Sequence, residues 1–268
     1  MKRTFTILMA VLLMASLLLT GCGKKNADDY EYITDKGTLT IGITIYEPMN
    51  YYDENGDLIG FDTEFAEAVC AELGVEPEFI EINWDTKEIE LEAKDIDCIW
   101  NGLTVTEERK ENMLFSDSYI KNMQVIVINK ANADVYTDTA SLAGATLVAE
   151  VSSAGETAIA DDENLSQAEY IAMPKQTDAL LEVLSGTADA AVLDYTLAKA
   201  MVGEGTDYED LMIIPNAELA VEEYAIGLRL DSTMAGPINE AIAKLAEDGT
   251  LAAIAEKYGL SDSLIFNQ

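Results

Sequence analysis

The sequence predicts an α/β fold in which helices flank largely parallel sheets. Short apolar or β-branched segments alternate with helix-like segments along most of the 268 residues. The alternation begins near Leu39 and starts again near Thr146, so two similar units follow one another along the chain. At roughly 150 residues per domain, the length suits one large or two modest domains.

The first run of the alternation contains strands, helices and one tight turn. Apolar or alternating residues predict strands at 39–45, 78–82, 96–100 and 124–128. Helices are predicted at 62–73 and 87–93. In the first helix Phe61, Phe65 and Val69 recur at helical spacing, and Gly74 can end it. Asn55-Gly56 lies between two short extended segments and predicts a hairpin turn.

The second run repeats the pattern and ends in two helices. Strands or extended segments are predicted at 146–149, 170–172, 190–193, 211–214 and 224–228. Helices are predicted from Ala154 onward and at 176–185, 232–247 and 250–258. Gly249 separates the last two helices. Strands and helices of this length in this order favour parallel strands joined by helical crossovers.

The N-terminal segment has the layout of a secretory signal. Lys2 and Arg3 precede residues 4–20, which carry no charge and are rich in aliphatic side chains. A membrane-spanning helix is the alternative, because a span needs about 20 apolar residues. Leu19-Thr20-Gly21-Cys22 follows and resembles the bacterial lipobox, which implies cleavage before Cys22 and a lipid on its sulfur. We therefore expect a signal peptide at 1–21 and a lipidated N-terminus with a polar tether at 22–36.

Composition excludes several kinds of chemistry. The chain has 50 acidic residues, 16 basic ones and no histidine. Nucleophilic systems that use histidine and histidine-ligated zinc sites are therefore impossible, and we expect neither a metal nor a cofactor. The acidity disfavours nucleic acid, whose phosphates need clustered Lys and Arg. It indicates solubility or, alternatively, a weak preference for cationic solutes.

Two cysteines, Cys70 and Cys98, lie within the predicted fold. An exported protein can join two cysteines whose Cα atoms lie within about 7 Å. Two buried free thiols are equally compatible with the sequence.

Three segments resemble motifs of the amino-acid receptors of ABC transporters, the periplasmic-type solute-binding proteins of family 3. LIGFDTE at 58–64 is similar to the G-F-D-x-D/E entry into the first helix. DCIWNGLTVTEER at 97–109 is similar to D-x-I-x-x-G-M-T-I-T-x-E-R, and FSDSY at 115–119 is similar to F-S-x-P-Y with Ser118 in place of proline. ADAAVLD at 188–194 is similar to the G-x-x-D-A-x-x-x-D motif of the second lobe. The resemblance extends over about Gly37 to Tyr258.

The resemblance implies a two-lobed fold of the type II periplasmic-binding-protein class. Each lobe would be a mostly parallel sheet flanked by helices. Lobe one would hold 37–125 and 226–268, and lobe two would hold 126–225. The chain would cross between the lobes near 124–128 and 224–228, where apolar extended segments suit a two-strand hinge.

The resemblance also implies a function. A monomer held to the outer face of the cell membrane by the lipid on Cys22 would bind a free amino acid between its lobes and deliver it to ABC permease subunits. Two alternatives come from other classes, since fold alone does not define function. One is an exported enzyme similar to cyclohexadienyl dehydratases, and the other is a ligand-sensing module for a membrane signalling partner.

The resemblance assigns roles to particular residues. Arg109 would bind the ligand carboxylate, for which its planar guanidinium is suited, and Asp194 would bind the ligand ammonium. Thr104 and the backbone at Gly102 would contact the polar ends of the ligand. Ser152 or Ser153, at the start of a predicted helix, would offer backbone N–H groups to the carboxylate.

The pocket for the ligand side chain is less defined by the sequence. Tyr46 and Trp100 are the chosen aromatic candidates, with Trp84 among the other residues near the predicted cleft rim. Glu47 and Glu150 could favour a cationic side chain, but solvated surface positions are the favoured interpretation for both. The sequence does not name the amino acid.

Overall fold

A computed structural model describes residues 28–215, 217 and 219–267 of the chain. The predicted signal peptide and the lipidation site Cys22 lie outside these residues. Among the residues that are described, no helix is long and apolar enough to cross a membrane.

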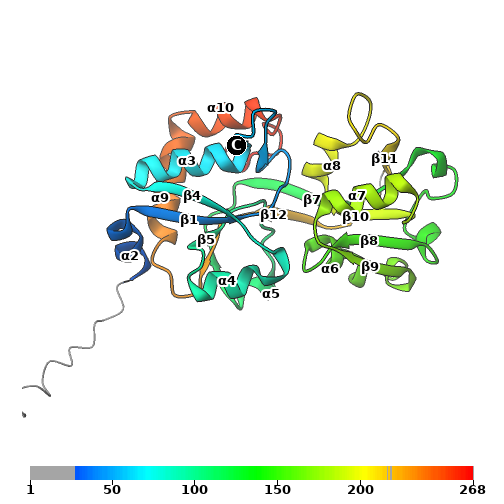
Figure 1. Ribbon diagram of the computed structural model, residues 1–268, viewed down its shortest axis with the longest axis horizontal. Helices are drawn as coiled ribbons and strands as arrows, with labels where there is room; N and C mark the ends of the chain where they lie inside the picture. The colour runs from blue at the N-terminus through cyan, green and yellow to red at the C-terminus, as the bar shows by residue number, and fades with distance from the viewer. Residues whose placement is uncertain (1–27, 216, 218, 268) are drawn as a thin grey trace, which may run out of the picture.

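Two separate sheets, each covered by helices on both faces, form the two lobes of the molecule (Figure 1). The sheet of lobe one has the order β4-β1-β5-β13-β6. Its strands are β1 (Thr38–Ile43), β4 (Glu76–Glu81), β5 (Cys98–Ile99), β6 (Met113–Phe115) and β13 (Gly227–Arg229). Helices α3 (Phe61–Leu73), α9 (Ala235–Glu247) and α10 (Thr250–Lys257) lie on one face, and α4 (Lys87–Ala93) and α5 (Glu107–Lys110) lie on the other.

The sheet of lobe two has the order β11-β7-β10-β8-β9. Its strands are β7 (Ile120–Asn129), β8 (Thr146–Glu150), β9 (Glu169–Met173), β10 (Ala190–Asp194) and β11 (Leu211–Ile213). Helix α6 (Ala154–Asp161) covers one face, and α7 (Gln176–Ser185) and α8 (Tyr195–Met201) cover the other. In each sheet one strand, β13 or β7, runs opposite to the rest. The predicted α/β class with mostly parallel strands is confirmed.

Two antiparallel strands run between the sheets. The first half of β7 pairs with β12 (Val221–Tyr224), from Ile120 opposite Tyr224 to Met123 opposite Val221. The second half of β7 pairs with β10 and β11 in the sheet of lobe two. The extended segment predicted at 224–228 is therefore two strands, because the chain leaves β12 at Tyr224 and enters the sheet of lobe one at Gly227.

Buried apolar residues explain why these segments pack as they do. Five of the six residues of β1 and all five residues of β10 are buried, as expected for central strands covered on both faces. Helix α3 buries Phe61, Phe65 and Val69 and ends at Gly74, whose φ of 72° suits a left-handed cap. The Asn55-Gly56 hairpin joins β2 (Tyr51–Tyr52) to β3 (Leu58–Ile59), as predicted.

The N-terminal segment differs from its prediction. We expected a tether as far as Lys36, but α2 (Asp29–Lys36) is a helix capped by Asp28 at its start and Gly37 at its end. Asp29 is buried and accepts a hydrogen bond from Arg229 Nε at 2.7 Å. This ion pair joins α2 to β13, so part of the predicted tether, from Asp29 onward, packs on lobe one.

The two cysteines are free and buried. Burial raises the pKa of Cys70 to about 12 and raises that of Cys98 well above its usual range. Both therefore act as small apolar side chains in the core of lobe one, and no disulfide joins them.

Candidate functional site

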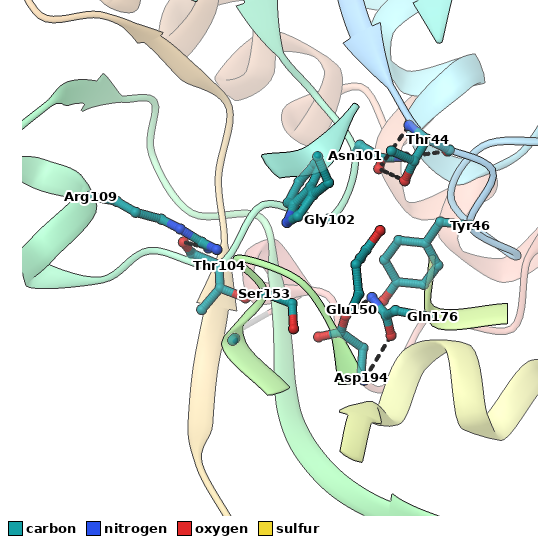
Figure 2. A pocket seen from close by; sticks show the side chains of 12 residues that line it. Thr44, Tyr46, Asn101, Gly102, Thr104, Arg109, Glu150, Ser153, Gln176 and Asp194 are labelled. Carbon is teal, nitrogen blue, oxygen red and sulfur yellow. Dashed lines mark hydrogen bonds between the residues drawn. The ribbon is translucent and has the colours of Figure 1, made fainter. Parts of the chain in front are cut away.

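A small pocket lies at the junction of the two lobes (Figure 2). Its free space is about 10 Å³, which is about enough for one water molecule. Lobe one and lobe two both line it, with Thr44, Tyr46, Trp84, Asn101, Gly102, Thr104 and Arg109 from the first and Glu150, Ser153, Ala154, Gln176 and Asp194 from the second. We call this space the inner pocket. Its small size means that the lobes are closed against each other.

Arg109 lies in the short helix α5, which Thr106 caps by accepting a hydrogen bond from the Arg109 N–H. The guanidinium is buried, and burial lowers its pKa. Nη1 donates to the Thr104 carbonyl at 2.8 Å, and Nη2 donates to the Ser152 carbonyl of lobe two at 3.1 Å. Arg109 makes no ion pair in the described part of the chain. A buried cation held only by neutral carbonyls is suited to bind an anion.

Asp194 ends β10 and is buried, with 7% of its surface exposed. It lies on the side of the inner pocket opposite Arg109 (Figure 2). It occupies the N-cap position of α8, but its side chain does not cap that helix. Instead Oδ1 accepts hydrogen bonds from Asn122 Nδ2 and Gln124 Nε2, both at 2.7 Å, and Oδ2 accepts one from Gln176. Three amide donors fix the carboxylate without neutralising it. Asp194 can therefore attract a cation in the inner pocket.

Gly102 places its backbone close to the pocket. Its φ of 57° favours glycine, and a Cβ there would lie 2.6 Å from Cε1 of Tyr46. The Gly102 N–H donates to Oδ2 of Asp62 at 2.7 Å, and Tyr119 donates to the same oxygen at 3.0 Å. Burial raises the pKa of Asp62 to about 7. The aspartate of the G-F-D segment therefore holds the loop that carries Gly102, from beneath the pocket.

Tyr46 lines the inner pocket, and its hydroxyl forms a hydrogen bond of 2.6 Å with the hydroxyl of Tyr224. Asn101 fixes the neighbouring chain, because its Oδ1 accepts from the N–H and hydroxyl of Thr44 and its Nδ2 donates to the Thr44 carbonyl. The sequence did not single out Thr44 or Asn101. Their polar pairing depends on β1 and β5 being neighbours, which the local pattern does not reveal.

The two serines separate into different roles. Ser153 lines the inner pocket and caps α6 by accepting from the Glu156 N–H at 3.1 Å. Ser152 has a φ of 57°, and its carbonyl accepts from Arg109 across the lobes. Ser152 lines a neighbouring groove instead, together with Asp85, Lys87, Arg109 and Glu156. We call this the outer groove.

Acidic side chains dominate the lobe-two side. Glu150 is buried at the end of β8 and lines the inner pocket, so its favoured surface interpretation was wrong. Burial, followed by repulsion from Asp194, raises its pKa to about 8. Glu222 of β12 accepts from Thr104 Oγ1 at 2.9 Å, Asn122 at 2.6 Å and Gln124 at 2.8 Å. Burial and the nearby Asp194 also raise the pKa of Glu222.

Trp100 does not line the pocket. Its ring is fully buried and meets Phe65 of α3 edge-on, with centroids 5.1 Å apart. Trp84 lines the pocket instead, and its buried indole Nε1 has no hydrogen-bond partner among the residues that the structure describes. A ring with a free donor at a pocket wall is suited to contact a ligand.

Gln176 is another lining residue that the sequence did not single out. It lies at the start of α7, donates to Asp194 and accepts from the Asp194 N–H at 3.0 Å. No group of three or more potential metal ligands was found within residues 28–215, 217 and 219–267.

Two α/β lobes that close on a pocket with opposite charges on its two walls have the architecture of a solute-binding protein. The chain belongs to the bacterial extracellular solute-binding proteins, family 3, whose model matches residues 39–261.

Individual relatives agree with this family. The L-cystine-binding protein TcyJ of Escherichia coli is 27% identical over 251 residues, covering 91% of this chain and 92% of the relative. The arginine-binding extracellular protein ArtP of Bacillus subtilis is 27% identical over 263 residues, covering 96% and 98%. The crystal structure of Tv2483 bound to L-arginine matches with a TM-score of 0.84 and 27% identity, covering 90% and 98%. All three are binding proteins or ligand complexes by name.

Proposed function

We propose that this protein is a receptor that binds one free amino acid between its lobes, with the ligand carboxylate on Arg109 and the ligand ammonium on Asp194. The observation that carries the proposal is the pair of buried, opposite charges on facing walls of the inner pocket, neither of which forms an ion pair in the part of the chain that is described. A zwitterion neutralises both charges at once. Each charge alone is costly to bury.

The ligand side chain is cationic in this proposal. Glu150 adds a second acidic side chain to the inner pocket, whose raised pKa of about 8 a bound cation would lower, and Glu222 shares its amide donors with Asp194. Trp84 is buried but forms part of the pocket wall, where its ring can contact a guanidinium or ammonium group. The relatives that bind arginine support the same class, whereas the relative that binds cystine represents a neutral alternative.

Closure couples binding to delivery. Arg109 belongs to lobe one and Asp194 to lobe two, and a ligand that contacts both favours the closed form over the open form. Strands β7 and β12 are the proposed hinge, since they form the paired connection between the two sheets. An ABC permease would then receive the closed, loaded receptor.

The anchor is the last part of the proposal. A lipid on Cys22 would keep the receptor at the outer face of the membrane. Cys22→Ala should move the protein from the membrane fraction to the soluble fraction. Retention of that variant in the membrane would favour an uncleaved helix at 4–20.

A thermal-shift screen of the twenty amino acids with ornithine and cystine tests the ligand class. Ligand at about 100 times its dissociation constant adds about 2.7 kcal/mol of stability. Arginine, lysine or ornithine should give the largest shift. A larger shift with glutamate or aspartate would contradict the cationic assignment, and no shift with any of them would contradict the receptor proposal.

A further inference from the structure

Lys87 is a buried lysine beside the site that the proposed function does not use. It lies at the start of α4 and is 3% exposed. Its Nζ donates to the Trp84 carbonyl at 3.1 Å and to the Ser152 carbonyl of lobe two at 3.1 Å. It also lies 4.9 Å from the centroid of the Trp84 ring. Lys87 thus contacts a pocket-lining aromatic and reaches across the lobes.

The Ser152 carbonyl oxygen accepts hydrogen bonds from two cationic side chains. Arg109 Nη2 donates to it at the same distance as Lys87 Nζ, 3.1 Å. Like Arg109, Lys87 makes no ion pair within the described residues. Each cation also donates to one carbonyl of lobe one, but neutral carbonyls do not compensate two desolvated charges, whereas a carboxylate shared between them can.

The conformation of Ser152 is held by several contacts. Its φ of 57° is uncommon for a residue other than glycine. Its N–H donates to Glu156 at 2.6 Å, and its hydroxyl donates to Asp85 of lobe one at 2.7 Å. Because Ser152 belongs to lobe two, opening of the cleft would withdraw its carbonyl from both cations.

We propose that Lys87 is a second carboxylate-binding residue beside Arg109, and that in the ligand-bound receptor the ligand carboxylate displaces the Ser152 carbonyl and accepts from both cations in its place. This inference rests on the proposed binding of an amino acid at Arg109. It adds a determinant for the carboxylate end that the resemblance does not assign. A receptor with two cations at this end should prefer a free carboxylate over an amide strongly.

The charges around Lys87 agree with an anion-binding role. Burial, followed by repulsion from Arg109, lowers its pKa to about 8. Glu88, Glu150 and Asp85 act in the opposite direction without forming an ion pair with it. Lys87 is therefore mostly charged at neutral pH, and a bound carboxylate would stabilise that charge.

Calorimetry with an amino acid and its α-amide tests the inference. The probe pair is the amino acid that stabilises the wild-type protein most in the screen, expected to be L-arginine, and the matching amide, L-argininamide. Lys87→Met should weaken binding of the acid about 10- to 100-fold and that of the amide less than about threefold. Lys87→Arg keeps the charge and should keep most of the preference for the acid.

Lys175→Met is the matched control. Lys175 also bridges the lobes, with its Nζ 3.8 Å from Glu81, but its side chain is 40% exposed and that of Glu81 is 45% exposed. The Lys175→Met variant should change the ratio of acid affinity to amide affinity by less than about twofold. Lys87→Gln replaces Lys87→Met if the latter does not unfold cooperatively.

Two results would overturn the inference. Equal losses for acid and amide in Lys87→Met would show that Lys87 only stabilises closure through Ser152. An unchanged acid affinity would show that it does not contact the ligand. Both results leave amino-acid binding by the wild-type protein intact, so they are distinguishable from failure of the proposed function.

Discussion

The two lobes present opposite charge to the pocket that they share. The charged residue that lobe one contributes to the inner pocket is Arg109, with Lys87 directly behind it. Lobe two contributes Glu150 and Asp194. None of these four residues forms an ion pair within the described residues, and in lobe two both cations contact the neutral Ser152 carbonyl.

Because of this difference, closure without a ligand leaves buried charged groups of both lobes without partners of opposite charge in the part of the chain that is described. The cations and carboxylates face one another across the inner pocket without an ion pair between them in the described residues. A ligand with a negative and a positive end can complete both sets of contacts at the same time. Removing the charge from one lobe at a time should therefore affect different ends of the ligand.

The largest effect is expected from lobe one. Arg109→Ala should weaken amino-acid binding by about 2 to 5 kcal/mol, because the ligand carboxylate loses its bidentate partner in a dry pocket. Titration calorimetry measures the loss. Lys110→Ala is the control, since Lys110 is the next residue but is exposed and pairs with Glu107. Affinity within about twofold of wild type in Arg109→Ala would contradict the carboxylate assignment.

Removing charge from lobe two should affect the other end. Asp194→Asn keeps the shape of the side chain and should cost about 1.5 to 3 kcal/mol in binding an α-amino acid. The same variant should bind 5-guanidinovaleric acid, which is arginine without its α-amino group, about as well as wild type does. Equal losses of affinity for the two ligands would show that Asp194 does not bind the ligand ammonium.

Glu150 allows a test that depends on pH. Its raised pKa of about 8 means that it is mostly protonated, and neutral, below pH 8. Glu150→Gln should therefore resemble wild type at pH 6.5, whereas at pH 8.5 the ionised wild type should bind arginine about tenfold more tightly than the variant does. Lys87 and the ligand amine titrate in both proteins, so the ratio of affinities isolates Glu150. A ratio of affinities that does not change with pH would show that Glu150 does not interact with the ligand cation.

The sequence predicted most of the fold because helix and strand periods and the turn residues are local properties. The helices α4 and α7 begin and end at the predicted residues, and Gly74 ends α3 as expected. Helix α2 was missed, since its polar surface resembles a tether and its anchor is Asp29, which pairs with a residue 200 positions away.

The candidate site could be predicted in part for a related reason. The residues within recognisable motifs, Arg109, Thr104, Gly102 and Asp194, all line the inner pocket. Glu150 and Lys87 lie outside those motifs, and their burial depends on how the two lobes meet. A charged residue next to a strand or helix end is most often exposed, so the local pattern gave no reason to place either one inside.

The aromatic residues show the same limit and allow the last test. Trp84 begins a short 3-10 helix before α4, whereas Trp100 follows the buried strand β5, and neither position has a local pattern that tells which ring meets the pocket. Trp84→Leu should weaken binding of a cationic amino acid by about 0.5 to 2 kcal/mol, because it removes the ring from the pocket wall.

Trp100→Leu is the matched comparison within the same lobe. It should lower the free energy of unfolding by about 2 to 4 kcal/mol through the cavity left beside Phe65, while changing affinity by less than about twofold. Thermal unfolding and calorimetry on both variants separate the two effects. A Trp100→Leu protein of normal stability with weakened binding would return Trp100 to the pocket and would mean that the ligand-bound form repacks the core of lobe one.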